Sequence, residues 1–199
     1  KQGRKYTETD TKKTVSQYLT TDKFELKTKR KNNLLKQHHI FLIDSSGSML
    51  KDQIIAYAKD AVNKIAENSK TQNTKFSIVS LFNGESQLIL TQTGILKDIE
   101  TALSTLKTGG KTNLKSGFKQ VKSICTEINY NHNLHIITDG KLNAGDNLED
   151  TVLAFQAFCK GIGNTQVIDA EKWFVTIGEA FELSKRINAN YEVLITENL

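Results

Sequence analysis

The stretch IFLIDSSGSM, residues 40–49, indicates both how this chain begins its fold and where a functional site lies. It opens with four apolar residues, three of them β-branched or aromatic, which is typical of a strand buried on both faces. The strand ends at Asp44, and Ser46 and Ser48 follow at alternate positions in a turn. A tight turn can direct these three side chains toward one point. One carboxylate and two hydroxyls are hard oxygen donors that suit Mg²⁺ or Mn²⁺.

Two later stretches can supply the further ligands that an octahedral ion requires. Thr112 lies in the loop TGGKTN, residues 108–113, and Asp139 ends a second apolar strand at residues 133–139. Asp44 could instead cap the helix that follows it, because Asp is a favoured capping residue. A helix cap does not account for the matching threonine loop and the second strand-terminal aspartate, so we predict a metal site.

The order of these motifs resembles the metal-ion-dependent adhesion site (MIDAS) of von Willebrand factor A (vWA, or integrin I-like) domains. In that family Asp-x-Ser-x-Ser follows the first strand, a threonine lies in a Gly-Gly loop before a helix, and Asp-Gly closes a later strand. The resemblance implies the following metal ligands: Asp44, Ser46, Ser48, Thr112 and Asp139. It also implies that an acidic side chain of a partner protein completes the coordination. Lys111 and Lys141 flank the ligand loops, where they either attract that acid or only keep the surface soluble.

The rest of the chain alternates predicted strands and helices, which indicates an α/β fold with right-handed crossovers. Strands are expected at residues 38–44, 76–82, 87–90, 133–139, 165–168 and 191–194, and helices at 51–68, 95–106, 114–128, 147–160 and 172–187. Asn83-Gly84 is a strong hairpin signal, so the third strand is predicted to be an antiparallel edge. We therefore predict a doubly wound, mostly parallel, Rossmann-like sheet with helices on both faces. In such sheets ligands bind outside the carboxyl ends of the strands, where Asp44 and Asp139 lie.

The charge of the chain is concentrated at its beginning. Residues 1–37 contain 11 Lys and Arg against 4 Asp and Glu, whereas the remainder contains 16 against 18. We predict a basic arm or linker at residues 1–36, with residues 1–22 extended and a short strand near 24–27, and one vWA domain at residues 37–199. The arm is either a solvated leader or a segment that docks on an acidic partner. Nucleic acid binding is disfavoured because no aromatic stacking pattern accompanies the charge.

No signal peptide and no apolar run of transmembrane length is present, so we expect a cytoplasmic protein. Cys125 and Cys159 fall on the apolar faces of predicted helices, where reduced thiols are the expectation and a disulfide is the alternative. The chain begins with Lys1 and not Met, so we expect it to be part of a longer protein.

Three catalytic interpretations are disfavoured. The phosphate-loop pattern requires a glycine where Thr105 stands, and a haloacid-dehalogenase-like phosphatase requires an aspartate where Ser46 stands. A serine nucleophile would need a base, but the strand spacing places every histidine far from the two serines. These histidines are expected to be structural or exposed: His38, His39, His132 and His135. We therefore predict that this part of the protein binds and does not catalyse.

A finer resemblance points to the C-terminal domain of the D subunit of magnesium chelatase. It lies in LKTGGKTNL (residues 106–114), ITDGKLN (137–143), QVIDAE (166–171) and a following ANY (189–191). The family usually has proline where Asn113 stands and arginine where Lys141 stands. The resemblance implies an AAA+ ATPase subunit and a large porphyrin-binding subunit as partners in ATP-dependent insertion of Mg²⁺ into protoporphyrin IX. The alternatives are a D-like subunit of cobaltochelatase, a vWA accessory protein of a MoxR-type AAA+ ATPase or, less favoured, an adhesion module.

Overall fold

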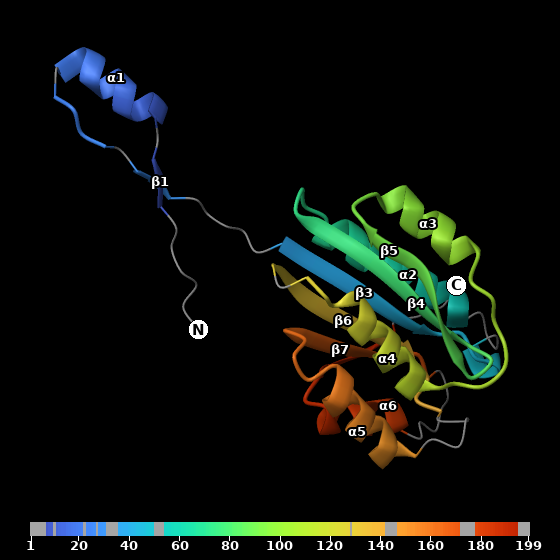
Figure 1. The fold of residues 1–199 in the computed structure, drawn as a ribbon. Coiled ribbons are helices and arrows are strands. Elements are labelled where there is room, and N and C mark those ends of the chain that lie inside the picture. Colours follow the sequence, from blue (N-terminus) through green and yellow to red (C-terminus); the bar gives the residue numbers. More distant parts are fainter. Residues whose placement is uncertain are drawn as a thin grey trace. The chain divides into compact units, whose positions relative to one another are not determined.

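The computed structural model divides into two units, Lys1–Leu34 and Leu35–Leu199, and each is described by itself (Figure 1). The structure describes residues 7–9, 11–21, 23–26, 28–30, 36–49, 54–127, 129–141, 147–171 and 178–194.

The first unit contains a short antiparallel pair, β1 (Thr7–Thr9) and β2 (Thr28–Arg30), with helix α1 (Thr11–Thr21) between them. The extended conformation predicted for residues 1–22 is therefore wrong for α1, and residues 23–26 do not form the predicted strand. The helix has a weak apolar stripe, because Val15, Tyr18 and Leu19 are spaced by three and four residues. These three side chains are exposed. The helix therefore buries little apolar surface, and its mostly polar sequence gives only a weak helical signal.

The second unit is built on a six-stranded sheet with the strand order β5-β4-β3-β6-β7-β8. Only β4 and β5 run antiparallel; all the other described neighbours are parallel. The strands are β3 (Lys36–Asp44), β4 (Thr74–Phe82), β5 (Glu85–Thr93), β6 (Tyr130–Thr138), β7 (Asn164–Asp169) and β8 (Asn190–Val193). This arrangement confirms the predicted mostly parallel sheet with one antiparallel edge.

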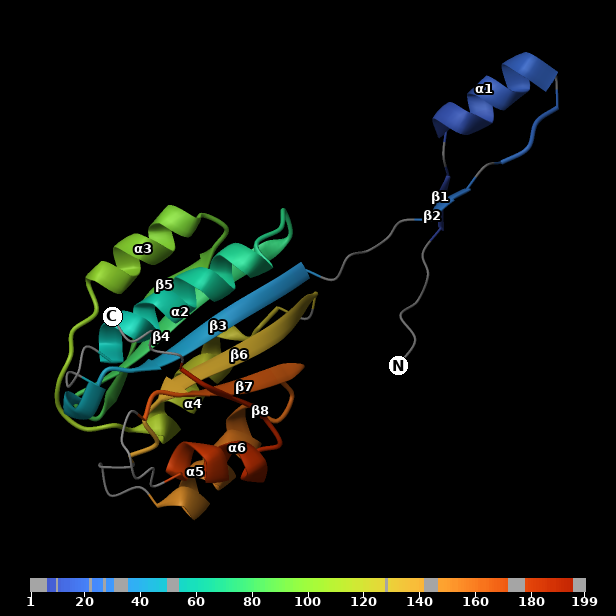
Figure 2. The same cartoon turned by 180° about the vertical axis from the view of Figure 1, so that it is seen from behind.

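Helices cover both faces of this sheet, as Figures 1 and 2 show from opposite sides. Helices α2 and α3 pack on one face, and α4, α5 and α6 pack on the other. Their bounds are α2 (Ile54–Ser69), α3 (Leu96–Ser104), α4 (Leu114–Ile124), α5 (Leu148–Phe158) and α6 (Glu179–Arg186). Each helix buries one apolar stripe, which is the pattern that predicted it.

The central strand β3 is the hydrophobic centre of the domain. Ile40 and Leu42 point into the core beneath α4, α5 and α6, whereas Phe41 and Ile43 point into the core beneath α2 and α3. All four side chains are fully buried, so the continuous apolar run follows from burial on both faces. The strand therefore holds Asp44 at a fixed position at its carboxyl end.

Some boundaries differ from the predicted ones. Helix α4 ends at Ile124, before the predicted end at residue 128, because Cys125 leaves the helical conformation. Residues 172–177, where the last helix was predicted to begin, lie outside the described residues. Cys125 and Cys159 are free thiols, as predicted. None of the helices in the described part of the chain has the length and apolar character that a membrane span requires.

Candidate functional site

The five side chains predicted as ligands lie together at the carboxyl ends of β3 and β6. Thr112 Oγ1 donates to both carboxylate oxygens of Asp44, at 3.2 and 3.0 Å. The Ser46 amide donates to Asp44 Oδ1 at 2.9 Å, and the hydroxyls of Ser46 and Ser48 lie 3.0 Å apart. Asp139 follows β6 and lies near enough to Asp44 to affect its titration. The fold thus gathers residues that are up to 95 positions apart in the chain.

The two carboxylates are almost completely buried, with Asp44 0% and Asp139 2% exposed. Burial raises the pKa of Asp44, and the charge of Asp139 raises it further, against hydrogen bonds that lower it. In the described part of the chain Lys141 is the one cationic side chain that pairs with either carboxylate; its Nζ lies 3.3 Å from Asp139 Oδ2. Two buried carboxylates facing one ammonium leave negative charge in excess. Together with three hydroxyls, this donor set fits a small divalent cation.

Thr138 donates a hydrogen bond that orients the Asp44 carboxylate, a role that the sequence did not predict. Its hydroxyl donates to Asp44 Oδ2 at 3.0 Å and accepts from the Gly140 amide at 3.0 Å. The side chain is fully buried. A hydroxyl at the last position of a buried strand, next to a strand-terminal acid, is the sequence signal that could have identified it.

The Gly-Gly loop approaches the serine turn through its backbone. The Gly109 amide donates to the Ser45 carbonyl at 2.7 Å, and the Gly47 amide donates to the Gly110 carbonyl at 3.1 Å. Gly110 has a φ of +75°, and a Cβ atom there would lie 2.5 Å from Asn83 Cα. Glycine is therefore required at this position both by conformation and by space.

The four histidines lie toward the amino end of β3, away from Asp44, and pair with one another. His38 Nδ1 lies 3.1 Å from His132 Nδ1, and His39 Nδ1 lies 3.0 Å from His135 Nε2. Burial lowers the pKa of both His38 and His39 to about 4, with a further contribution from their histidine partners. These histidines were expected to be structural or exposed, and their hydrogen bonds among the described residues favour the structural alternative.

Two of the motifs behind the finer resemblance meet in the structure. Tyr191 donates its hydroxyl to Asp169 Oδ2 at 2.6 Å, and the Glu171 amide donates to Asp169 Oδ1 at 2.8 Å. Burial and this contact raise the pKa of Tyr191 to about 12. The QVIDAE and ANY segments therefore form one polar link between β7 and β8.

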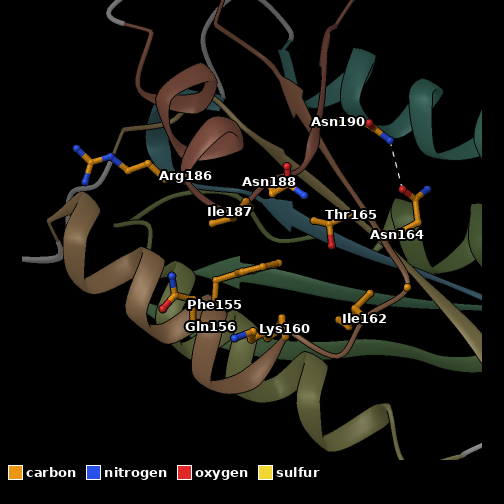
Figure 3. A pocket seen from close by; sticks show the side chains of 12 residues that line it. Phe155, Gln156, Lys160, Ile162, Asn164, Thr165, Arg186, Ile187, Asn188 and Asn190 are labelled. Atoms are coloured by element: carbon orange, nitrogen blue, oxygen red, sulfur yellow. Dashed lines mark hydrogen bonds between the residues drawn. The ribbon is translucent and has the colours of Figure 1, made fainter.

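A cavity of about 460 Å³ lies elsewhere, at the amino ends of β7 and β8 (Figure 3). Asn190 Nδ2 donates to Asn164 Oδ1 there at 3.3 Å. Two basic side chains, Lys160 and Arg186, line it near the carboxyl ends of α5 and α6, where cations balance the helix dipoles. None of the predicted ligands lines this cavity, so it is not the site that the sequence predicts.

An α/β sheet with this strand order and an oxygen-rich site at its carboxyl edge define the class of the domain. The chain belongs to the von Willebrand factor type A domain family, whose model matches residues 39–141. Among solved structures, a von Willebrand factor type A protein from Catenulispora acidiphila superposes with a TM-score of 0.67 at 18% identity, covering 86% of this chain and 40% of that one. BatB from Bacteroides thetaiotaomicron superposes with a TM-score of 0.62 at 17% identity, covering 81% and 92%. These likenesses show the fold.

Curated relatives give a more particular similarity. The magnesium-chelatase 67 kDa subunit of Chlorobaculum parvum is 27% identical over 199 residues, covering 90% of this chain and 32% of the relative. An uncharacterised protein of Mycobacterium tuberculosis is 25% identical over 166 residues, covering 80% and 26%. The chain thus spans about a third or less of the length of these relatives.

Proposed function

We propose that this domain is a metal-dependent protein-interaction module. Mg²⁺ or Mn²⁺ would be held by the converging side chains of Asp44, Ser46, Ser48, Thr112 and Asp139. The observation that supports this proposal is the pairing of two buried carboxylates with three hydroxyls and a single lysine among the described residues. When bound, the ion supplies a positive centre with a coordination position for a partner's carboxylate.

The chain's own residues prepare this site. Thr138 and the Ser46 amide each donate to Asp44 and so orient its carboxylate toward Thr112. Lys141 balances part of the negative charge on Asp139. Lys111 is exposed and lies in the same loop as Thr112, where its charge would attract an acidic partner. The site as a whole binds and orients, and none of the described histidines is hydrogen-bonded to it as a base would be.

We further propose that the domain belongs to the D subunit of an ATP-dependent magnesium chelatase and is not itself catalytic. The support is the similarity to the magnesium-chelatase 67 kDa subunits of two Chlorobaculum species, together with the Asp169–Tyr191 link between the QVIDAE and ANY motifs. The partners would then be an AAA+ ATPase subunit and a large porphyrin-binding subunit.

The test is affinity purification of the full-length protein from its native cells in Mg²⁺, followed by mass spectrometry. Wild type is compared with Asp44→Ala and with Asp60→Ala, a control that removes an exposed acid on α2. We expect wild type and Asp60→Ala to recover an AAA+ ATPase and a large chelatase subunit, and Asp44→Ala to lose both.

Other outcomes would change the proposal in defined ways. Recovery of an AAA+ ATPase without a tetrapyrrole enzyme would indicate the MoxR-type accessory role, and recovery of a cobalt-inserting enzyme would indicate cobaltochelatase. Equal recovery of the same partners by Asp44→Ala would contradict docking through the metal site.

A further inference from the structure

The turn between β4 and β5 is joined to the metal-site loop by backbone hydrogen bonds. The Gly84 amide donates to the Lys111 carbonyl at 2.8 Å, and the Asn83 amide donates to the Gly109 carbonyl at 3.3 Å. Asn83 and Gly84 have φ values of 52° and 79°, as a tight hairpin turn requires. The turn therefore presents its amides to the loop that contains Thr112.

Asn113 adds a side-chain link at the point where this loop becomes helix α4. Its Nδ2 donates to the Gly84 carbonyl at 3.0 Å, and its Oδ1 accepts from the Ser116 amide at 2.9 Å. One amide group thus caps α4 and holds the hairpin turn at the same time. Asn113 directly follows Thr112, so both of its contacts restrict the backbone that positions the Thr112 hydroxyl.

The contact between turn and loop is also sterically tight. Gly110 leaves no room for a side chain, because a Cβ atom would lie 2.5 Å from Asn83 Cα and 2.9 Å from Asn83 N. A displacement of the turn would therefore be transmitted directly to the loop. Thr112 belongs to this loop, and its hydroxyl donates to Asp44. The position of the turn therefore affects the distance between the Thr112 hydroxyl and the Asp44 carboxylate.

We propose that the β4–β5 turn holds Thr112 in the geometry that the ion requires, and that Asn113 is the positioning residue that ties the turn to the loop. This inference rests on the proposed metal-binding function. It assigns to Asn113 a role that a residue without a side-chain donor could not fill, since the bond to Gly84 needs the amide N–H.

The test compares Asn113→Ser with Asn147→Ser. Serine caps helices about as well as asparagine, so each variant keeps its helix cap. Asn147 caps α5 through the Asp150 amide, and no hydrogen bond among the described residues links it to the turn. Serine at position 113 is too short to cap the helix and reach the Gly84 carbonyl together. The pair therefore isolates the tie to the turn from the loss of a cap.

Two readouts are needed, amide hydrogen exchange without metal and Mn²⁺ affinity by titration. We expect Asn113→Ser to speed exchange of the Gly84 and Asn83 amides and to weaken Mn²⁺ binding about tenfold, as loss of an outer-shell contact does. Asn147→Ser should change neither.

Each alternative result has a separate meaning. Unchanged exchange at Gly84, or faster exchange with unchanged Mn²⁺ affinity, would overturn the role of Asn113. Failure of the wild-type protein to bind Mn²⁺ would instead defeat the proposed function, and the exchange data would still show whether Asn113 ties the turn to the loop.

Discussion

The two ends of strand β3 differ in the side chains that they carry. At the amino end, ring nitrogens of His38 and His39 pair with neutral side chains. At the carboxyl end, the charge of Asp44 lies next to that of Asp139. Both ends are polar and largely buried. They differ in whether their polar groups meet each other's need for hydrogen bonds and opposite charge. The amino end is balanced in donors and acceptors, and the carboxyl end keeps an excess of negative charge.

The balance at the amino end can be followed from bond to bond. His132 Nε2 faces the Glu127 carbonyl at 3.3 Å, so it must carry a hydrogen, and its Nδ1 then accepts from His38 Nδ1. His38 Nε2 in turn accepts from the Ser77 hydroxyl at 2.8 Å. This assignment of hydrogens follows from the network. The rings of His38 and His132 are both neutral in it, so this pair is balanced without a charged group.

The carboxyl end shows the opposite arrangement. Its loops are held by backbone contacts such as those of Gly109 and Gly110. Within this frame the Thr112 hydroxyl points toward the Asp44 carboxylate, and the hydroxyls of Ser46 and Ser48 lie together. Like charges brought together in a buried site cost stability unless a cation joins them. The comparison teaches that the polar groups at the amino end of β3 pair with one another, whereas the carboxyl end keeps the unbalanced charge on which the proposed metal site depends.

The largest effect is expected from breaking the backbone contact at the carboxyl end with Gly110→Ala. The new Cβ would meet Asn83 and the positive φ would be strained, so the free energy of unfolding should fall by about 3 kcal/mol. Gly84→Ala is the matched control, because its φ of +79° is similar but no atom lies within 4 Å. It should cost only about 1 kcal/mol. Equal losses in urea denaturation would contradict the close contact.

The amino end should weaken in acid. The pKa of His38 and of His39 is lowered from 6.5 to about 4, so the unfolded chain binds protons more readily between these values. The contribution of these two neutral histidines to stability is therefore fully present above pH 6.5, and it is lost as the pH falls toward 4. We expect a loss of about 2 kcal/mol between pH 7 and pH 4.5, less than the sum of two independent shifts because the pairs share hydrogen bonds.

His38→Asn tests the origin of this acid effect, since an amide keeps a donor for His132 but does not titrate. Urea denaturation at both pH values should show a smaller acid loss in the variant than in wild type. The same loss in both proteins would mean that other groups, such as the buried carboxyls, determine the pH dependence.

The smallest effect has the opposite sign and comes from Asp44→Asn without divalent metal. The amide removes a buried charge beside Asp139 and can still accept from the Ser46 amide, so stability should rise by about 1 kcal/mol. Asp60→Asn, on the exposed surface of α2, should change stability by less than about 0.5 kcal/mol. Thermal denaturation in the presence of a chelator measures both changes. A less stable Asp44→Asn protein would contradict the proposed excess of negative charge at the site.

Much of the fold follows from local patterns that the sequence shows directly. The apolar run before Asp44 predicts a strand buried on both faces, and Asn83-Gly84 predicts the hairpin that makes β5 antiparallel. Helix α1 was missed because its few apolar residues are exposed and outnumbered by polar ones. Periodicity reports burial, so a helix with little to bury gives a weak signal.

The sequence by itself determined the parallel sheet, the strand-terminal aspartates and the spacing of Ser46 and Ser48, because these depend on periodicity and on neighbours along the chain. The bond from Thr138 to Asp44, the pairing of His38 with His132 and the tie from Asn113 to Gly84 were decided only by tertiary structure. Each of these contacts joins residues at least 29 positions apart. Such contacts depend on strand order and loop packing, so a local pattern can mark a residue such as Thr138 but cannot identify its partner.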